Sequence, residues 1–114
     1  TIEEAKAMTE AGADIVVAHM GLTTKGRIGA VSAKTLDDCV AEVSRIVDTC
    51  KGLRSDCLVL CHGGPIAEPA DAAYVLERVP GCDGFYGASS MERLPTEIAV
   101  TEQVRQFTSV RLGR

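Results

Sequence analysis

The stretch Asp14-Ile15-Val16-Val17-Ala18-His19-Met20 decides the fold of this 114-residue chain. Its apolar, mostly β-branched residues form a continuous run and do not alternate with polar ones. Such a run is typical of a parallel strand that is buried on both faces of a sheet. A second run, Cys57–His62, is again apolar, and a third strand is predicted at Cys82–Gly87. The sequence therefore predicts three parallel strands.

Helical patterns lie between these strand-like runs. Thr1 and Glu4 have the spacing of a capping box, and Thr35 is suited to cap a second helix. Pro69 and Pro95 suit the first turn of two further helices, because the first turn needs no backbone N–H from proline. The predicted helices span residues 1–12, 35–52, 69–81 and a segment from 95 onward, the last with Val100, Val104 and Phe107 on one side.

The predicted element order is α-βα-βα-βα, which indicates an α/β fold with a parallel sheet. Three parallel strands cannot easily cover their own edges, and a whole (β/α)₈ barrel needs about 250 residues. Residues 1–114 are therefore expected to form one partial TIM-barrel domain, the last three βα units of a barrel. Two alternatives remain, an assembly with other chains and an open sheet.

Composition and charge argue against several functional classes. Hydrophobic residues make up 46% of the chain and charged residues 25%, as in ordinary globular domains. The net charge of -4 gives little electrostatic support for nucleic-acid binding. The longest apolar runs are too short to cross a bilayer, and the first residues lack the features of a signal peptide. We expect a cytoplasmic protein that acts without a membrane or a nucleic acid.

Five cysteines lie at positions 39, 50, 57, 61 and 82, an odd number without a C-x-x-C pair. The pattern favours reduced, buried thiols in a cytosolic protein over a disulfide framework. Cys61 precedes His62 directly, and adjacent strand residues point to opposite faces. A Cys-His nucleophilic pair from these two residues is therefore not expected.

Both histidines of the chain, His19 and His62, end neighbouring predicted strands at corresponding positions. Ligands of parallel α/β folds bind at the carboxyl ends of the strands, where a histidine can act as acid, base or metal ligand. We therefore take both as candidate catalytic residues. The alternative is a pair of histidines held by backbone hydrogen bonds under a loop. Two histidines alone do not make a metal site, so no metal ligand is assigned.

Small residues follow all three predicted strands and suggest a site for a phosphate or carboxylate. Such residues let backbone N–H groups approach an anion, and a following helix N-terminus adds partial positive charge. In the alternative, the glycines only make tight turns. The long connection 21–35 is expected to be functional. Its Lys25 and Arg27 side chains either clamp an anionic substrate or are simply exposed to solvent. The candidate substrate-binding residues are Gly21, Thr23, Gly63, Gly64, Gly87, Ser89 and Ser90.

The strand-end strings resemble the C-terminal part of the phosphoenolpyruvate hydrolase-like TIM-barrel domain, which also occurs in plant tobamovirus-resistance proteins. The strings that carry this resemblance are His19-Met20-Gly21-Leu22-Thr23-Thr24, Ile28-Gly29-Ala30, Leu60-Cys61-His62-Gly63-Gly64-Pro65-Ile66 and Asp83-Gly84-Phe85-Tyr86-Gly87-Ala88-Ser89-Ser90-Met91-Glu92-Arg93-Leu94-Pro95.

The resemblance implies a barrel related to the phosphoenolpyruvate mutase and isocitrate lyase group, which handles small phosphorylated pyruvate-like acids with a divalent metal. It implies lyase or hydrolase chemistry in the intact barrel, with little activity expected of this chain alone. It also implies Mg²⁺ on acidic residues of earlier strands, so no cofactor is expected within this chain. The expected partners are a small anionic metabolite and either the remainder of the barrel or a second copy. The plant relatives, which act by binding a viral protein, keep a non-catalytic ligand-sensing or protein-binding module open as the alternative.

Overall fold

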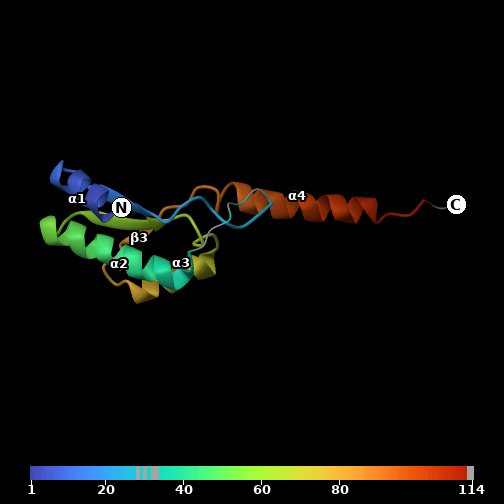
Figure 1. Cartoon of the computed structure of the whole chain (residues 1–114). Coiled ribbons are helices and arrows are strands. Elements are labelled where there is room, and N and C mark those ends of the chain that lie inside the picture. The colour runs from blue at the N-terminus through green and yellow to red at the C-terminus, as the bar shows by residue number, and fades with distance from the viewer. Residues whose placement is uncertain (28, 30, 32–33, 113–114) are drawn as a thin grey trace.

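The computed structural model describes residues 1–27, 29, 31 and 34–112, and shows four helices and three strands within them (Figure 1). The strands are parallel and lie in the order β1-β2-β3. The α/β class and the parallel sheet are thus confirmed. In chain order the elements are α1 (Ile2–Glu10), β1 (Ile15–His19), α2 (Leu36–Leu53), β2 (Leu58–His62), α3 (Pro69–Arg78), β3 (Gly84–Phe85) and α4 (Arg93–Thr108).

Local capping explains where the first two helices begin. At α1 the Thr1 hydroxyl accepts the Glu4 N–H at 3.2 Å, and Thr35 caps α2 by accepting the Asp38 N–H at 3.1 Å. Several predicted boundaries were wrong. The helices α1 and α3 end earlier than predicted, at Glu10 and Arg78, and β3 is shorter than the predicted run 82–87. The α2 helix continues through Gly52 to Leu53, because packing elsewhere along the helix outweighs the modest helical cost of one glycine. The α4 helix begins at Arg93 and holds Pro95 in its first turn.

All the helices that pack on the sheet cover the same face of it. Right-handed crossovers between sequential strands in the order β1-β2-β3 put the connecting helices on one side. Val16 and Ala18 of β1 and Val59 and Cys61 of β2 are accordingly buried, at 8% exposure or less. The other face of these strands remains open, and Ile15 there is 53% exposed.

The prediction that the strands are buried on both faces is therefore wrong for this chain. The burial alternates along β1 and β2, although the apolar character of the residues does not. Apolar side chains on the uncovered face, among them Ile15, Val17 and Leu58, lack a covering layer within the described residues. We refer to this surface as the open face, and it carries Ile15, Val17, His19, Leu58, Leu60 and His62.

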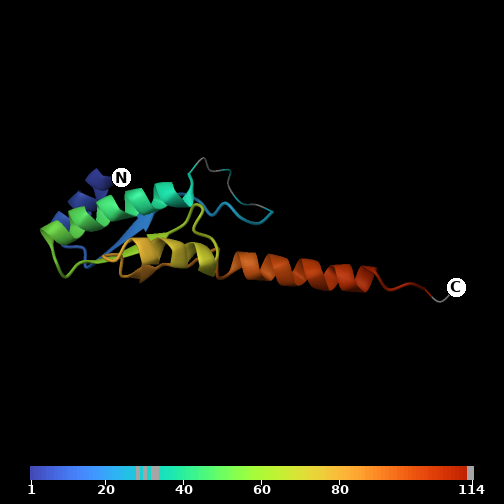
Figure 2. The same ribbon diagram turned by 90° about the horizontal axis from the view of Figure 1, so that it is seen from below.

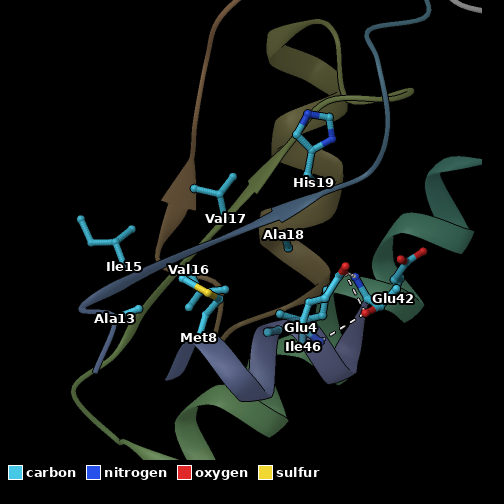
Figure 3. Close-up of a pocket in the computed structure, with 12 residues that line it drawn as sticks. Glu4, Met8, Ala13, Ile15, Val16, Val17, Ala18, His19, Glu42 and Ile46 are labelled. Carbon is cyan, nitrogen blue, oxygen red and sulfur yellow. Dashed lines mark hydrogen bonds and ion pairs between the residues drawn. The ribbon is translucent and has the colours of Figure 1, made fainter. Parts of the chain in front are cut away.

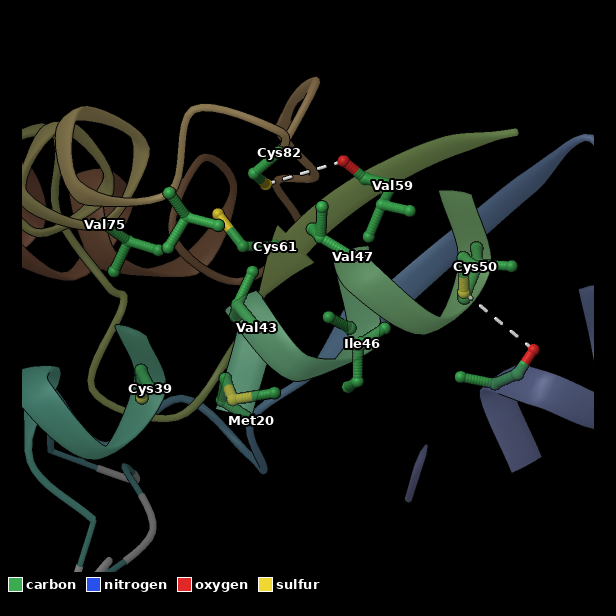
Figure 4. Close-up of a cluster of buried hydrophobic side chains, with 14 of the residues drawn as sticks. Met20, Cys39, Val43, Ile46, Val47, Cys50, Val59, Cys61, Val75 and Cys82 are labelled. Atoms are coloured by element: carbon green, nitrogen blue, oxygen red, sulfur yellow. Dashed lines mark hydrogen bonds between the residues drawn. The ribbon is translucent and has the colours of Figure 1, made fainter. Parts of the chain in front are cut away.

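The hydrophobic core lies between the sheet and its helices, as Figure 4 shows. Val43, Ile46 and Val47 of α2 point into it, and Val75 of α3 is fully buried. All five cysteines are buried and free, as the sequence predicted. Cysteine here behaves as a small apolar residue that fills the core.

The α4 helix does not return to pack on the sheet beside β3. Figures 1 and 2 show it extending away from the other elements, so that the C-terminal end lies far from the N-terminus. The described chain measures 72 × 24 × 22 Å and has a radius of gyration of 18.2 Å, against about 13 Å for a compact domain of this length. Val100, Val104 and Phe107, which were predicted to share one side of this helix, are exposed, and the Phe107 side chain is 70% exposed.

Asp83 joins three elements at the start of the short strand β3. Its carboxylate accepts the Val59 N–H of β2 at 2.8 Å and lies 2.8 Å from the Lys51 ammonium of α2. Its own N–H donates to the Val59 carbonyl, also at 2.8 Å. The hydrogen bond from Lys51 and that from the Val59 N–H hold the pKa of Asp83 below its usual value. Since β3 has only two residues, these bonds do much to fix its place.

We expect Asp83→Asn to lower the free energy of unfolding by about 1 kcal/mol at pH 7, because the ion pair is partly exposed. The native pKa is depressed, so the stabilisation is fully present above the unfolded-state pKa of about 4. It is lost as the pH falls through the lower native pKa. Urea unfolding between pH 7 and pH 3 measures this. Asp48→Asn, at an exposed position of α2, is the control, and equal effects of the two variants would contradict the role of Asp83.

Candidate functional site

The two histidines meet on the open face at the carboxyl ends of β1 and β2. The strands pair in register from Ile15 with Leu58 to His19 with His62, so the two side chains emerge side by side. Their ring centroids are 4.7 Å apart, and the rings are nearly perpendicular at 85°. The structure thus brings together the two residues that the sequence singled out. We call His19, His62 and the neighbouring Tyr86 the strand-end site.

Backbone groups orient both imidazoles. The Gly21 N–H donates to Nδ1 of His19 at 3.1 Å, and Nδ1 of His62 lies 2.7 Å from the carbonyl oxygen of Tyr86. Backbone contacts therefore hold the Nδ1 atom of each histidine, as the alternative interpretation expected. Among the described residues, neither Nε2 atom has a hydrogen-bond partner.

Tyr86 completes the row, and sequence reasoning gave it no role. It follows β3 directly, and its ring lies 5.2 Å from that of His62 at an angle of 78°. The three rings thus follow the ends of three consecutive strands, with His62 in the middle. The position of Tyr86 at the third strand end was a signal that could have identified it.

The turn after β2 is built from two glycines in left-handed conformations, with φ values of 77° at Gly63 and 60° at Gly64. A Cβ atom on Gly64 would lie 2.5 Å from the Met20 carbonyl oxygen, and one on Gly63 would collide with the Gly21 carbonyl. The Gly64 N–H donates to that Gly21 carbonyl at 2.7 Å, and the Thr24 N–H donates to the Gly64 carbonyl at 3.2 Å. Close approach of the two turns therefore requires glycine here.

These bonds bear on the predicted anion site. The N–H groups of Gly21 and Gly64 already have partners within the chain. Gly63 lies against His19, since a Cβ placed on it would be 3.4 Å from His19 Cε1. Thr23, which follows β1, is half-buried. The turns thus position the strand-end site, and their role in anion binding stays a prediction.

The third group of predicted residues lies elsewhere. Gly87, Ser89 and Ser90 form the turn before α4, where the Ser89 carbonyl accepts the N–H groups of Arg93 and Leu94. Ser90 borders a largely apolar groove of about 370 Å³ beside α3 and β3, whereas His19 borders a different groove. The structure thus leaves Ser90 and His19 in separate grooves.

Lys25 forms ion pairs within the chain. Its ammonium lies 2.8 Å from Asp71 and 3.1 Å from Glu68 at the start of α3. The hydrogen bond to Asp71 raises the pKa of Lys25. Burial alone would raise the pKa of Asp71, but hydrogen bonds from Lys25 and from two backbone N–H groups lower it overall. An anion clamp by Lys25 would have to break these pairs. The Arg27 side chain is exposed, so its predicted role has no contact to support it.

The groove that His19 borders runs along the free edge of β1, with a volume of about 380 Å³. In Figure 3, Ile15, Val17 and His19 extend from one side of β1, while Val16 and Ala18 lie toward Met8 and Ile46 of the helices. The edge has no neighbouring strand in the described part of the chain. The lining residues are Thr1, Glu4, Ala5, Met8, Ala13, residues 15–19, Glu42 and Ile46.

Other chemistries find little support in the residues that the structure describes. They contain no group of three or more His, Cys, Asp or Glu side chains able to hold a metal ion, so the residues present do not fit a Mg²⁺ site. Cys61 is fully buried beneath the sheet, away from His62, and hydrogen bonding with Cys82 together with burial raises the pKa of its thiol. No helix in these ranges is both long and apolar enough to cross a bilayer.

Known proteins that match this chain agree with the family resemblance of the strand-end strings. Two tomato (Solanum lycopersicum) proteins, ToMV susceptible protein tm-1(GCR26) and ToMV resistance protein Tm-1(GCR237), are each 58% identical to this chain over 108 residues. The match covers 95% of this chain but only 14% of each relative. A putative transcriptional regulatory protein, y4pA of Sinorhizobium fredii, is 28% identical over 110 residues, which is 18% of its length.

The family model that matches the chain is described as phosphoenolpyruvate hydrolase-like. Of the strings that resemble this family, Ile28 and Ala30 lie outside the described residues, and the strands, turns and helix starts described above carry the others. The match extends over residues 1–110, nearly the whole sequence, and the chain therefore belongs to the phosphoenolpyruvate hydrolase-like family.

Proposed function

We propose that residues 1–114 supply three consecutive βα units, the last three, of a (β/α)₈ barrel, whose interior is the open face. The uncovered apolar residues Ile15, Val17 and Leu58 support this, because soluble proteins seldom leave such a surface without a covering partner. The sequential strand order and the helices on one face are the arrangement a barrel requires. The remainder of the barrel, or a second copy, would cover this face and the free edge of β1.

We further propose that the strand-end site binds a small metabolite bearing a phosphate or carboxylate. The observation that carries this is the register that places His19 beside His62 at the carboxyl ends of parallel strands, where ligands of barrels bind. His19 and His62 then transfer a proton or orient the substrate. Gly21, Thr23, Gly63, Gly64, Gly87, Ser89 and Ser90 are the proposed anion-binding residues. For Ser90, which borders the groove beside α3 and β3, this requires a ligand or a loop that spans the two grooves.

The proposed reaction class is hydrolase or lyase chemistry on a phosphoenolpyruvate-like acid, carried out by the intact barrel. Family membership supports this class. Mg²⁺ would belong to residues outside this chain, since the described residues do not form a site for it. No step is therefore assigned to the metal, and the chemistry proposed for this chain is limited to its two histidines.

A second function is a binding module without catalysis. The tomato relatives support it, because their names describe susceptibility or resistance to ToMV and no catalysed reaction. The susceptible and resistance proteins match this chain equally, at 58% identity.

In a polypeptide that contains the complete barrel, we expect phosphoenolpyruvate or phosphonopyruvate to raise the melting temperature, because a ligand that binds only the folded state stabilises it. Differential scanning fluorimetry with and without Mg²⁺ measures this. An unchanged melting temperature with both acids under both conditions would contradict the proposed ligand class.

Turnover separates the two functions. For an enzyme, His19→Ala and His62→Ala should each lower product formation by about 10²- to 10⁴-fold. Lys6→Ala, on the exposed side of α1, is the control. Ligand binding without product in the unmodified protein, and normal binding by both histidine variants, would favour the binding module.

The barrel itself is tested by Val17→Asp, which puts a charge on the open face. In the complete barrel we expect a loss of more than 2 kcal/mol of unfolding free energy, since the charge would be buried without a partner. In the 114-residue chain, where Val17 is 38% exposed, the loss should be well below this. Leu22→Asp, at a 74% exposed position, is the control. Equal small losses in both polypeptides would contradict a barrel interior at this face.

A further inference from the structure

The backbone contacts of the two histidines determine where each neutral imidazole carries its proton. A backbone N–H can only donate, so the Gly21 N–H at 3.1 Å requires a lone pair on Nδ1 of His19. A backbone carbonyl can only accept, so the Tyr86 oxygen at 2.7 Å requires a proton on Nδ1 of His62. The remaining nitrogen of each ring then has the opposite character.

We propose that His19 and His62 form a donor–acceptor pair, in which Nε2–H of His19 donates and Nε2 of His62 accepts. The two rings lie 4.7 Å apart, and no described residue occupies either Nε2 atom. A ligand that reaches both Nε2 atoms therefore meets one hydrogen-bond donor and one acceptor. Two histidines of like tautomer would instead offer two donors or two acceptors.

The pair selects a chemical class of ligand, and this step rests on the proposed function of the strand-end site. A 2-hydroxy acid offers what the pair needs on adjacent carbons, a carboxylate that accepts from His19 and a hydroxyl that donates to His62. A 2-oxo acid has only acceptors at these positions, so it leaves Nε2 of His62 without a partner. An unmade hydrogen bond in a binding site lowers affinity. The strand-end site therefore favours hydroxy acids over the corresponding oxo acids, and an oxo acid such as phosphonopyruvate binds there with one hydrogen bond fewer.

The neighbours of the pair keep its polarity fixed. The Gly21 carbonyl accepts the Gly64 N–H at 2.7 Å, so the residue whose N–H orients His19 is itself held by the turn after β2. The Tyr86 N–H donates to the Cys61 carbonyl at 2.9 Å, which fixes the peptide segment that orients His62. Rotating either ring by 180° would remove its Nδ1 bond. The two tautomers are thus properties of the sheet and its turns.

The test reads the tautomers directly from long-range proton–nitrogen NMR spectra of the labelled 114-residue chain, at a pH where both imidazoles are neutral. The sequence contains two histidines, so His19→Gln and His62→Gln each leave one ring and assign both sets of signals. If one variant does not fold, the other assigns both rings by difference. We expect the proton on Nε2 in His19 and on Nδ1 in His62. The same tautomer in both rings, or the reverse assignment, would overturn the proposal.

Titration with lactate and with pyruvate tests the ligand class in the same spectra. We expect lactate to shift both imidazoles and to bind about tenfold more tightly than pyruvate, the factor that loss of one hydrogen bond produces. In His62→Gln the difference should shrink, while His19 still responds. Equal binding of the two acids, or no response to either, would overturn the assigned ligand class. The tautomers are read without ligand, so a wrong tautomer assignment and a failure of the proposed metabolite site are distinguishable. The melting experiment tests the metabolite site separately.

Discussion

The rest of the candidate site depends on the register between β1 and β2. Parallel pairing of Ile15 with Leu58 sets His19 opposite His62, and both side chains emerge on the open face. A slip of one residue would turn one histidine toward the helices, since side chains alternate between faces. The turns reinforce the register, because the Met20 N–H donates to the His62 carbonyl at 2.8 Å and the Gly64 N–H binds the Gly21 carbonyl.

The same alternation divides the sheet into two environments. Cys61 and Ala18 fill the core under the helices, and their chain neighbours His62 and His19 lie on the open face. The apolar residues of the open face have no covering layer in the described part of the chain. The strand sequence is nevertheless of the kind that is buried on both faces of a sheet, which is why burial in this structure could not be predicted from it.

Local features were predictable from the sequence, and features that depend on distant contacts were not. The capping box at Thr1, the cap at Thr35 and the apolar runs predicted the first two helix starts and the first two strands, because each depends on a few neighbouring residues. The pairing of the histidines followed from their equivalent strand positions. The engagement of the Gly64 N–H with Gly21, and the direction of α4, depend on contacts between segments far apart in the chain and have no local signal.

The base of α4 is held by the loop that follows β1. Arg93 donates to the Lys25 carbonyl at 3.1 Å, and the Arg27 N–H donates to Glu97 at 3.3 Å, while Lys25 is paired with Asp71 of α3. Beyond Glu97, α4 extends away from the other elements as far as Thr108, or about 16 Å, and so acts as a lever arm. A tilt of about 10° at its base would move its tip by about 3 Å. Any shift of the loop beside the strand-end site is thus amplified at the far end of the molecule.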